Sequence, residues 1–503
     1  MLAASILGSS MAFVDGSVVN LALPALQRSF GATVADAQWV VESYSLFLAA
    51  LLLIGGALGD RLGRRRVFAS GVTVFALASA ACGLAPNPAW LIGARAVQGI
   101  GAALLVPGSL ALLSATFAPD HRGRAIGIWS AGSAAAAGIG PVLGGWLIET
   151  ASWRWIFWLN VPLAALTLAV TLSHVPESRA PDSAGRLDWA GASLVTAGLG
   201  ALVYGLIEAP RVGLAAPGTV AAIAAGAILL AVFVGFERRA AHPMVPLDLF
   251  RSRTFAGANL LTLFLYAALG GVFFFLPFLL IQVHHYSATA AGAAMLPLVA
   301  LLFLLSPWAG RLADRRGARG PLVIGPLIAA GGYVLLGLPG AGGSYWTTFF
   351  PGIVVLGLGM AVSVAPLTDA VMVAAPTARA GAASGINNAV SRTAGLLAVA
   401  VFGLVASARF NPALDRRLEA LHPKPEIRAA LAGARDRLAG TEIPAAVPAD
   451  ERDRVRRAIQ DAFVQAFGTL TLLGAGLAVA AAASAWVCLE PRKGRAAGPR
   501  RSR

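Results

Sequence analysis

Charge is scarce in this sequence. Only 13% of its 503 residues are charged, about half the share found in ordinary soluble domains, whereas 57% are hydrophobic and the mean hydropathy is +0.73. So few charges could not cover the surface of a water-soluble chain of this length. The composition therefore excludes a cytosolic enzyme, a disordered scaffold and a secreted domain, and it predicts an integral membrane protein.

Other absences narrow the function further. The sequence has no Walker-type phosphate loop, no GxSxG motif and no cluster of metal ligands, so we expect no enzyme activity, no direct use of ATP and no cofactor. The two cysteines, Cys82 and Cys488, fall near opposite predicted faces of the bilayer, and no disulfide is expected between them. No basic segment precedes the first apolar run, which argues against a cleavable signal peptide.

Nearly all of the basic charge is arginine. Of 39 basic residues only Lys424 and Lys493 are lysines, and the net charge is +15. A basic chain often binds nucleic acid, but here the basic residues occupy short gaps between apolar runs. We therefore expect no nucleic-acid partner, and we interpret these residues as topology signals that face anionic lipid headgroups.

Fourteen segments are apolar enough to cross a bilayer, which takes about 20 helical residues. The alternative count is twelve spans, without the seventh and eighth. If both termini are cytoplasmic, that side holds 23 Lys and Arg residues and the short outer loops hold three. We expect a multi-pass protein of the plasma (inner) membrane with both termini cytoplasmic. The expected spans are 4–27, 39–59, 67–86, 89–115, 125–148, 155–175, 189–208, 218–236, 255–282, 289–309, 321–339, 346–372, 382–408 and 463–489.

The motif between the second and third spans recurs later in the chain. Gly56–Arg66 weakly matches Gly310–Arg319, and eight spans separate the copies, so both copies face the same side. We therefore predict an all-α protein with two parallel six-span halves and a two-span insert, an architecture typical of transporters with a midplane site. The predicted units are a first half at 1–180, the insert at 181–250, a second half at 251–490 and a basic cytoplasmic tail at 491–503.

The second half includes a long extracytoplasmic loop at 409–462. This loop holds 11 basic and 9 acidic residues, and two of its stretches have helical periodicity. Pro448 and Asp450 are start signals for the second stretch. The sequence leaves open a helical hairpin that leads into the last span or a solvated, charged loop.

Ionisable side chains inside the predicted spans are the candidate functional residues, because a charge in the bilayer is costly unless it is paired. Asp15 lies mid-span, and burial favours the neutral form of a carboxylic acid, so Asp15 is the best candidate proton carrier. Arg95 needs an anionic or carbonyl partner, which Asp15 or Glu42 could supply; a purely structural role for Asp15 or Arg95 is the alternative. The candidate proton-coupling residues are Asp15, Glu42 and Arg95.

The candidate residues of a substrate cavity overlap with this set. Acidic residues in a dry cavity would suit lipophilic cations, whose charge they neutralise. Glu42 and Asp369 could serve in this way, or they could lie at the membrane interface instead. The cavity candidates are Asp15, Asn20, Glu42, Gln98, Asp369 and Arg392.

Two glycine-containing motifs indicate close helix contacts. In Gly56–Arg66, Asp60 can accept hydrogen bonds from a neighbouring helix N-terminus, and such a charge–dipole latch would favour an outward-facing state. In the fifth span, Pro141 removes a helix hydrogen bond and the glycines beside it permit bending and close packing. The latch candidates are Gly56, Asp60, Arg61, Gly63, Arg64 and Asp314, and the fifth-span motif consists of Gly140, Pro141, Gly144 and Gly145.

Taken together, these motifs resemble the fourteen-span drug:proton antiporter family of the major facilitator superfamily, the QacA/EmrB-like exporters. The matching segments are Gly56–Arg66, Asp15–Pro24, Arg95–Ala102 and Ala136–Gly145, where Ala136 replaces the first glycine of the family's pattern. The resemblance implies a major facilitator fold and proton-driven export of hydrophobic, cationic drugs by alternating access. It also implies that substrate and proton compete for Asp15 and that Arg95 takes part in proton transfer.

The partners implied by the resemblance are a small hydrophobic substrate, protons and the lipid bilayer, and we expect the chain to function as a monomer. Whether a periplasmic adaptor protein docks stays open. So do three other functions: a dedicated exporter of one endogenous metabolite, antibiotic or lipid; a non-transporting membrane sensor, against which the intact motifs argue; and an uptake symporter, which the fifth-span motif disfavours.

Overall fold

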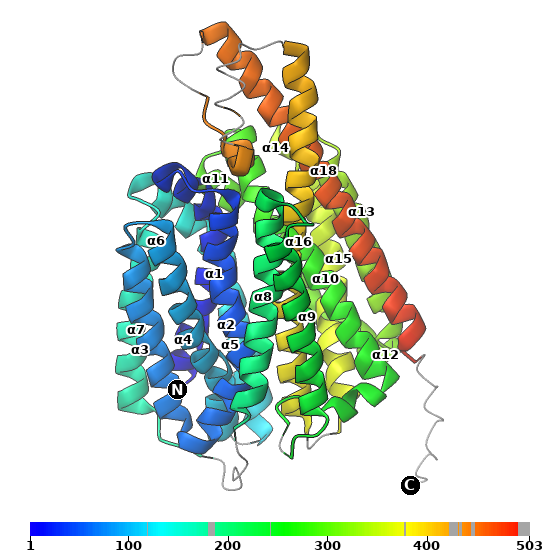
Figure 1. Ribbon diagram of the computed structural model, residues 1–503. Coiled ribbons are helices and arrows are strands. Elements are labelled where there is room, and N and C mark those ends of the chain that lie inside the picture. Colours follow the sequence, from blue (N-terminus) through cyan, green and yellow to red (C-terminus); the bar gives the residue numbers. More distant parts are fainter. Residues whose placement is uncertain are drawn as a thin grey trace.

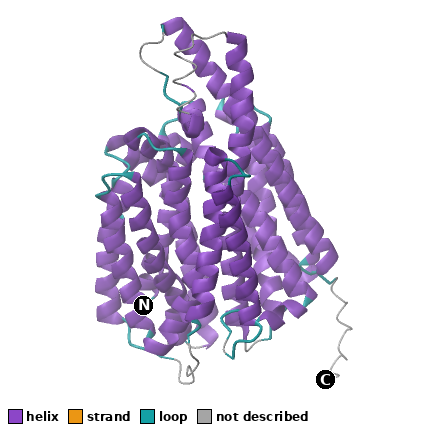
Figure 2. Ribbon diagram, viewed as in Figure 1, coloured by secondary structure: helices purple, strands orange, loops and turns teal. Residues whose placement is uncertain are grey.

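The secondary structure of the described residues is entirely helical (Figure 2). The computed structural model describes residues 1–117, 119–179, 187–241, 243–376, 379–421, 431, 435–443 and 448–490. Fourteen helices within these ranges are long and apolar enough to cross a membrane. The prediction of fourteen spans is therefore confirmed, and the alternative count of twelve is wrong. The predicted basic tail, 491–503, lies outside the described residues.

Local sequence signals explain where the helices of the first half begin. Thr33 and Asp36 form a capping box at the start of α2, in which each side chain accepts a hydrogen bond from the other's main-chain N–H. Asn87 caps α4 in front of a proline. Gly63 separates α2 from α3 with a φ of +117°, which a residue with a side chain rarely adopts. The helices are α1 (Leu2–Phe30), α2 (Val34–Leu62), α3 (Arg64–Gly83), α4 (Pro88–Thr116), α5 (Pro119–Thr150), α6 (Trp155–Trp158) and α7 (Asn160–His174).

The packing order of the first half recurs in the second. Just as α4 packs against α2 and α3, α15 packs against α12 and α13, and α1 packs on α5 as α10 packs on α16. A parallel repeat of six spans produces such a pattern. The helices of the second half are α10 (Arg253–Phe278) with its continuation η2 (Leu279–Val283), α11 (Ala288–Ala293), α12 (Leu296–Arg316), α13 (Arg319–Gly337), α14 (Tyr345–Thr348), α15 (Phe350–Val373), α16 (Ala380–Leu421) and α18 (Ala449–Cys488).

The insert lies against the seam between the two halves (Figure 1). Its helices α8 (Trp189–Val212) and α9 (Pro217–Glu237) pack on each other, and α8 also packs on α2 of the first half and on α16 of the second. A small buried cluster joins these three helices through Leu46, Leu199 and Leu396. The short helix η1 (Leu247–Arg251) then leads into the second half.

The two ends of the bundle differ. We call the end that carries 409–462 the loop end, and the opposite end, which carries Gly56–Arg66, the arginine end. At the loop end α16 and α18 project beyond the bundle (Figure 1). They are continuous with their spans, because hydropathy ends a span where charge begins, whereas the helix continues. The predicted start at Pro448 is confirmed, because α18 begins at Ala449.

Candidate functional site

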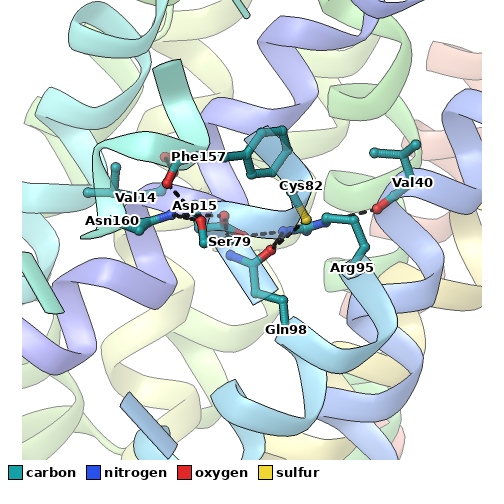
Figure 3. A network of polar contacts seen from close by, with 10 residues as sticks. Val14, Asp15, Val40, Ser79, Cys82, Arg95, Gln98, Phe157 and Asn160 are labelled. Carbon is teal, nitrogen blue, oxygen red and sulfur yellow. Dashed lines mark hydrogen bonds and ion pairs between the residues drawn. The ribbon is translucent and has the colours of Figure 1, made fainter. Parts of the chain in front are cut away.

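An ion pair is buried in the interior of the first half (Figure 3). Arg95 Nη1 donates to Asp15 Oδ2 at 2.6 Å and thereby joins α4 to α1. Both side chains are only 1% exposed. Either charge buried alone would be costly, and the pair satisfies both. The sequence left Asp15 and Glu42 as alternative partners for Arg95, and the partner in the structure is Asp15.

Two amide side chains complete the surroundings of the Asp15 carboxylate (Figure 3). Gln98 Nε2 donates to Asp15 Oδ1 at 2.9 Å, and Gln98 Oε1 accepts from Arg95 Nη1 at 2.8 Å. Asn160 Nδ2, at the start of α7, donates to Asp15 Oδ1 at 3.4 Å and to Ser79 Oγ at 3.0 Å. Helices α1, α3, α4 and α7 therefore meet in one buried network. Gln98 was among the predicted site residues, whereas Ser79 and Asn160 were not.

Helix α2 holds the other side of the Arg95 guanidinium. Arg95 Nε donates to the Val40 carbonyl at 3.0 Å, and the Tyr44 ring lies 4.2 Å from the guanidinium carbon, a cation–π distance. Gly99 permits this approach, because a Cβ there would clash with the main chain of Tyr44. The sequence pattern of α4 thus has a structural reason: its Arg and Gln reach Asp15, and the glycine lets α2 come close. Near the same network Cys82 is buried and free, and Cys488 is also free, as expected.

Glu42 lies on a different face of α2. It is one turn from Gln38, whose Nε2 donates to the Val399 carbonyl of α16 at 2.7 Å. Residues four apart share a helix face, so Glu42 faces α16 and not Arg95. Its side chain is 1% exposed, and neither carboxylate oxygen has a hydrogen-bond partner among the described residues.

The other predicted cavity residues are dispersed. Asp369 is exposed toward the arginine end of α15, within electrostatic range of Asp314 on α12. Asn20 is half-buried on α1, and its Oδ1 has no hydrogen-bond partner in the part of the chain that the structure describes. Arg392 is half-buried on α16. The described contacts place none of these residues in the Asp15 network.

The loop motif at the arginine end makes a local pair. Arg64 Nε donates to Asp60 Oδ1 at 2.9 Å. The N-terminus of α3 is capped by Glu177, which accepts from the main-chain N–H of Arg65 at 3.0 Å and of Arg66 at 3.3 Å. Glu177 could not be found from the sequence, because it follows α7 and no local pattern links it to α3. The latch role of Asp60 stays a prediction. So does the latch role of the other candidates, which are Gly56, Arg61, Gly63 and Asp314.

The fifth-span motif brings α5 against helices of both halves. Gly140 and Gly144 leave room for α1, and a Cβ on Gly145 would clash with the main chain of Ala288 in α11. The carbonyl of Pro141 lies in turn against a glycine of α11. These small residues therefore permit a close contact between the two halves.

Adding one methyl group at this contact should impair transport. In Gly145→Ala the new Cβ meets main-chain atoms, which cannot rotate away, so overpacking should cost about 1–3 kcal/mol in this conformation and slow the transport cycle by about tenfold. Gly127→Ala is the matched control, because it lies in α5 beside open space. Transport assays in proteoliposomes would measure both rates. Equal rates for the two variants would contradict a functional role for the close approach.

The hydrogen bonds described between the two halves all lie toward the loop end. The 3₁₀ helix η4 (Arg435–Gly440) also packs there and contacts α1 and α2 of one half and α16 and α18 of the other. This conformation is therefore held closed at the loop end. Glu149 escaped prediction because the pairing of α5 with α11 is not local. The cross-half bonds join Gln282 to Gln27 (3.0 Å), Thr289 N and Oγ1 to Glu149 (2.9 and 2.6 Å), and Gln38 to Val399 (2.7 Å).

Neutralising Glu149 should loosen the loop end. Glu149→Gln keeps the shape of the side chain but loses charge-assisted hydrogen bonds to the start of α11, a change of about 0.5–1 kcal/mol. Buried Ala288, replaced by Cys, should then react about two- to fivefold faster with a membrane-impermeant maleimide added at the loop end. Glu208→Gln is the control, since Glu208 pairs with Arg211 in its own helix. An unchanged labelling rate in Glu149→Gln would show that this contact does not hold the halves together.

A separate apolar cavity of about 550 Å³ lies where the insert meets both halves. Helices α2, α8, α9, α10 and α16 line it, and Asn259 and Thr393 are the polar residues on its wall. It offers room for hydrophobic groups beside the seam. Asp15 and Arg95 do not line it, so this cavity is distinct from the buried network.

Two similarly packed helical halves around buried charges are typical of membrane transporters. The chain belongs to the Major Facilitator Superfamily, whose family model matches residues 5–399. The predicted family and fold are thereby confirmed. A solved structure of a bacterial homologue of the lysosomal transporter Spinster, in an inward-facing and occupied conformation, shares the fold, with a TM-score of 0.65, 20% identity and coverage of 97% of this chain and 96% of that chain.

Two relatives in sequence are more similar. The chain is 39% identical over 433 residues to the multidrug resistance protein Stp of Mycobacterium tuberculosis, covering 86% of this chain and 80% of that protein. It is 34% identical over 488 residues to the tetracenomycin C resistance and export protein of Streptomyces glaucescens, covering 96% and 90%.

Proposed function

We propose that the chain exports hydrophobic drugs or toxic compounds in exchange for protons across the plasma membrane. The observation that carries the proton coupling is the buried Asp15–Arg95 ion pair, because a carboxylate inside the membrane that is held by one guanidinium can exchange that partner for a proton. The names of the two relatives support drug export, since both align over most of their length. The arginine-rich loops support placing the arginine end in the cytoplasm.

Protonation of Asp15 would remove the charge that holds α1 to α4. Arg95 would keep its bond to the Val40 carbonyl and its contact with Tyr44, both on α2, while its attraction to α1 falls. Helix α1 packs on α5, and the Gly145 region of α5 contacts the other half, so the Asp15–Arg95 pair is linked through α1 and α5 to the contact between the halves. Asp15 would take up a proton while the loop end is open and release it toward the arginine end after the loop end has closed.

The geometry favours indirect competition between substrate and proton. Asp15 is 1% exposed on its side chain, and its oxygens already accept from Arg95, Gln98 and Asn160. A drug could not reach the carboxylate without displacing these donors. We therefore place the coupling in the movement of α1 against α4, not in direct binding of the drug to Asp15.

A narrower function is the second candidate. The tetracenomycin C protein is named for a single compound, and the chain covers 90% of its length. A dedicated exporter of one metabolite or antibiotic is therefore the alternative to a multidrug exporter. The two differ in the number of unrelated compounds that drive proton movement.

Proteoliposomes with an acidic interior test the proposal. A pH dye inside should report proton release when a transported drug is added outside, and the signal should vanish when an ionophore collapses the pH gradient. Response to several unrelated drugs would indicate a multidrug exporter, and response to one would indicate the dedicated one. Uphill drug movement that persists without any pH gradient would contradict proton coupling.

A further inference from the structure

One basic side chain inside the membrane-spanning bundle has no ion-pair partner among the described residues. Arg95 is matched by Asp15, but Arg392 on α16 has no ion pair or hydrogen bond among the described residues, and its Nε is buried without a partner. An unpaired guanidinium inside a membrane protein is costly and marks a functional position. We therefore expect a ligand that is not part of the described chain to bind beside Arg392.

Arg392 lies beside an open face of α16. Asn388 and Gly381, four and eleven residues earlier, share this face and are exposed, and a Cβ built on Gly395 would meet nothing. Helix α16 is covered elsewhere by α2, α8, α10 and α18. Arg392 lies within electrostatic range of Tyr44 on α2 of the first half, so we infer that this face borders the space between the halves.

Helix α1 of the other half has a similar open face. Phe13 is 37% exposed, and a Cβ on Gly16 would meet nothing, although α1 packs against α4, α5, α7 and α10. Asn20 follows on the same face, with its Oδ1 unpartnered in the described residues. The two open faces provide aromatic and amide groups around a space in which Arg392 has no matching negative charge.

No carboxylate of the described bundle neutralises Arg392. Asp15 is committed to Arg95. Glu42 forms no ion pair with Arg392, and neither of its carboxylate oxygens has a hydrogen-bond partner among the described residues. Tyr44 lies within electrostatic range of Arg392, but a tyrosine is neutral at physiological pH. Arg392 therefore presents a positive charge that no described residue pairs with.

We propose that Arg392 binds the substrate and selects it by charge. The exported drug would be a hydrophobic ring system with an acidic oxygen, such as a carboxylate, phenolate or enolate. The guanidinium donates two parallel hydrogen bonds to the two oxygens of a carboxylate, or both of them to the one oxygen of a phenolate or enolate, in a fixed planar geometry that an ammonium lacks. A cationic drug would be repelled, because the dry site strengthens like-charge repulsion. This assignment rests on the proposed export function, and it reverses the cationic preference expected from the sequence.

Three naphthalene probes of similar size test the assignment. They are 1-hydroxy-2-naphthoate (anionic), its methyl ester (neutral) and a naphthyl trimethylammonium (cationic), each titrated against the full-length protein in lipid nanodiscs. The wild type should bind the anion at least about tenfold more tightly than the cation. Arg392→Gln should weaken the anion by about tenfold and leave the ester nearly unchanged, and Arg392→Lys should fall between them.

The control is Arg409→Gln, which removes an exposed guanidinium from the projecting part of the same helix and should change no affinity. Folding is checked by thermal unfolding, and Arg392→Gln should melt no lower than wild type, because no described partner loses its charge. A wild type that prefers the cation, or fails to bind the anion, overturns the assignment. So does an Arg392→Gln variant that melts normally and binds all three probes as the wild type does.

The outcomes also separate this assignment from the proposed function. Anion-selective binding that depends on Arg392, without any proton-driven transport in liposomes, supports the site and contradicts proton-coupled export. Proton-driven transport of the cationic probe, without preference for the anion, supports export and overturns the role of Arg392.

Discussion

Replacing Asp15 by Asn should abolish substrate-driven proton release from acid-loaded proteoliposomes, down to the rate of liposomes without protein. Asn has nearly the same shape and can still bond Gln98, but it cannot bind and release a proton. Arg95 would keep the Val40 carbonyl, Gln98 and the Tyr44 ring as partners, so the variant should still fold. The signal to measure is the internal pH dye, with drug binding recorded in parallel to show that the drug site remains.

The matched control is Asp36→Asn, which neutralises a carboxylate in the capping box of α2, outside the buried network. It should retain proton release, at some cost in stability. If Asp15→Asn proves too unstable to purify, the double variant with Arg95→Gln removes the orphaned cation and gives the same test. Wild-type proton release by either variant would exclude Asp15 as the carrier and direct attention to Glu42, which is buried without a described partner.

The spans could be predicted because each is a run of apolar side chains long enough to cross the bilayer, and that property is local. The same rule made the predicted spans shorter than helices α16 and α18. Their helices continue to Leu421 and start at Ala449, in charged sequence outside the apolar run. Hydropathy measures preference for lipid, whereas helix continuation depends on backbone hydrogen bonds and caps, so the two boundaries need not coincide.

The central residues could be named from the sequence, but their pairing could not. Asp15, Arg95 and Gln98 stood out because buried polar groups in a span are costly. Choosing Asp15 over Glu42 as the partner of Arg95 required the rotation of α2, which directs Val40 and Tyr44 toward α4 and Glu42 toward α16. Such a rotation follows from the packing of the whole bundle.

The residues that form hydrogen bonds between distant helices could not be predicted, for a related reason. Asn160 and Glu149 are ordinary polar residues near helix ends, and nothing beside them in the sequence indicates that they meet Asp15 and Thr289. Counting the acids in the spans also does not reveal which of them are paired, and the structure pairs Asp15 with Arg95.

Arg95→Gln should destabilise the protein by about 3–5 kcal/mol, because it leaves the Asp15 carboxylate buried with only amide donors. Thermal unfolding in detergent, followed by tryptophan fluorescence, would record the fall in the midpoint temperature. Arg154→Gln is the control: Arg154 also donates to a main-chain carbonyl and lies over Trp153, but it has no described carboxylate partner and is only half-buried. Its loss should cost about 1 kcal/mol.

The double variant Asp15→Asn with Arg95→Gln decides why the stability falls. It contains no orphaned charge, so it should melt well above Arg95→Gln alone, with a coupling energy of at least about 2 kcal/mol between the two sites. If Arg95→Gln melts at the wild-type temperature, Asp15 already exists as the neutral acid in the folded protein and holds the proton before any drug arrives. The resting state would then be the proton-loaded one, and the cycle proposed above would begin with proton release instead of proton uptake.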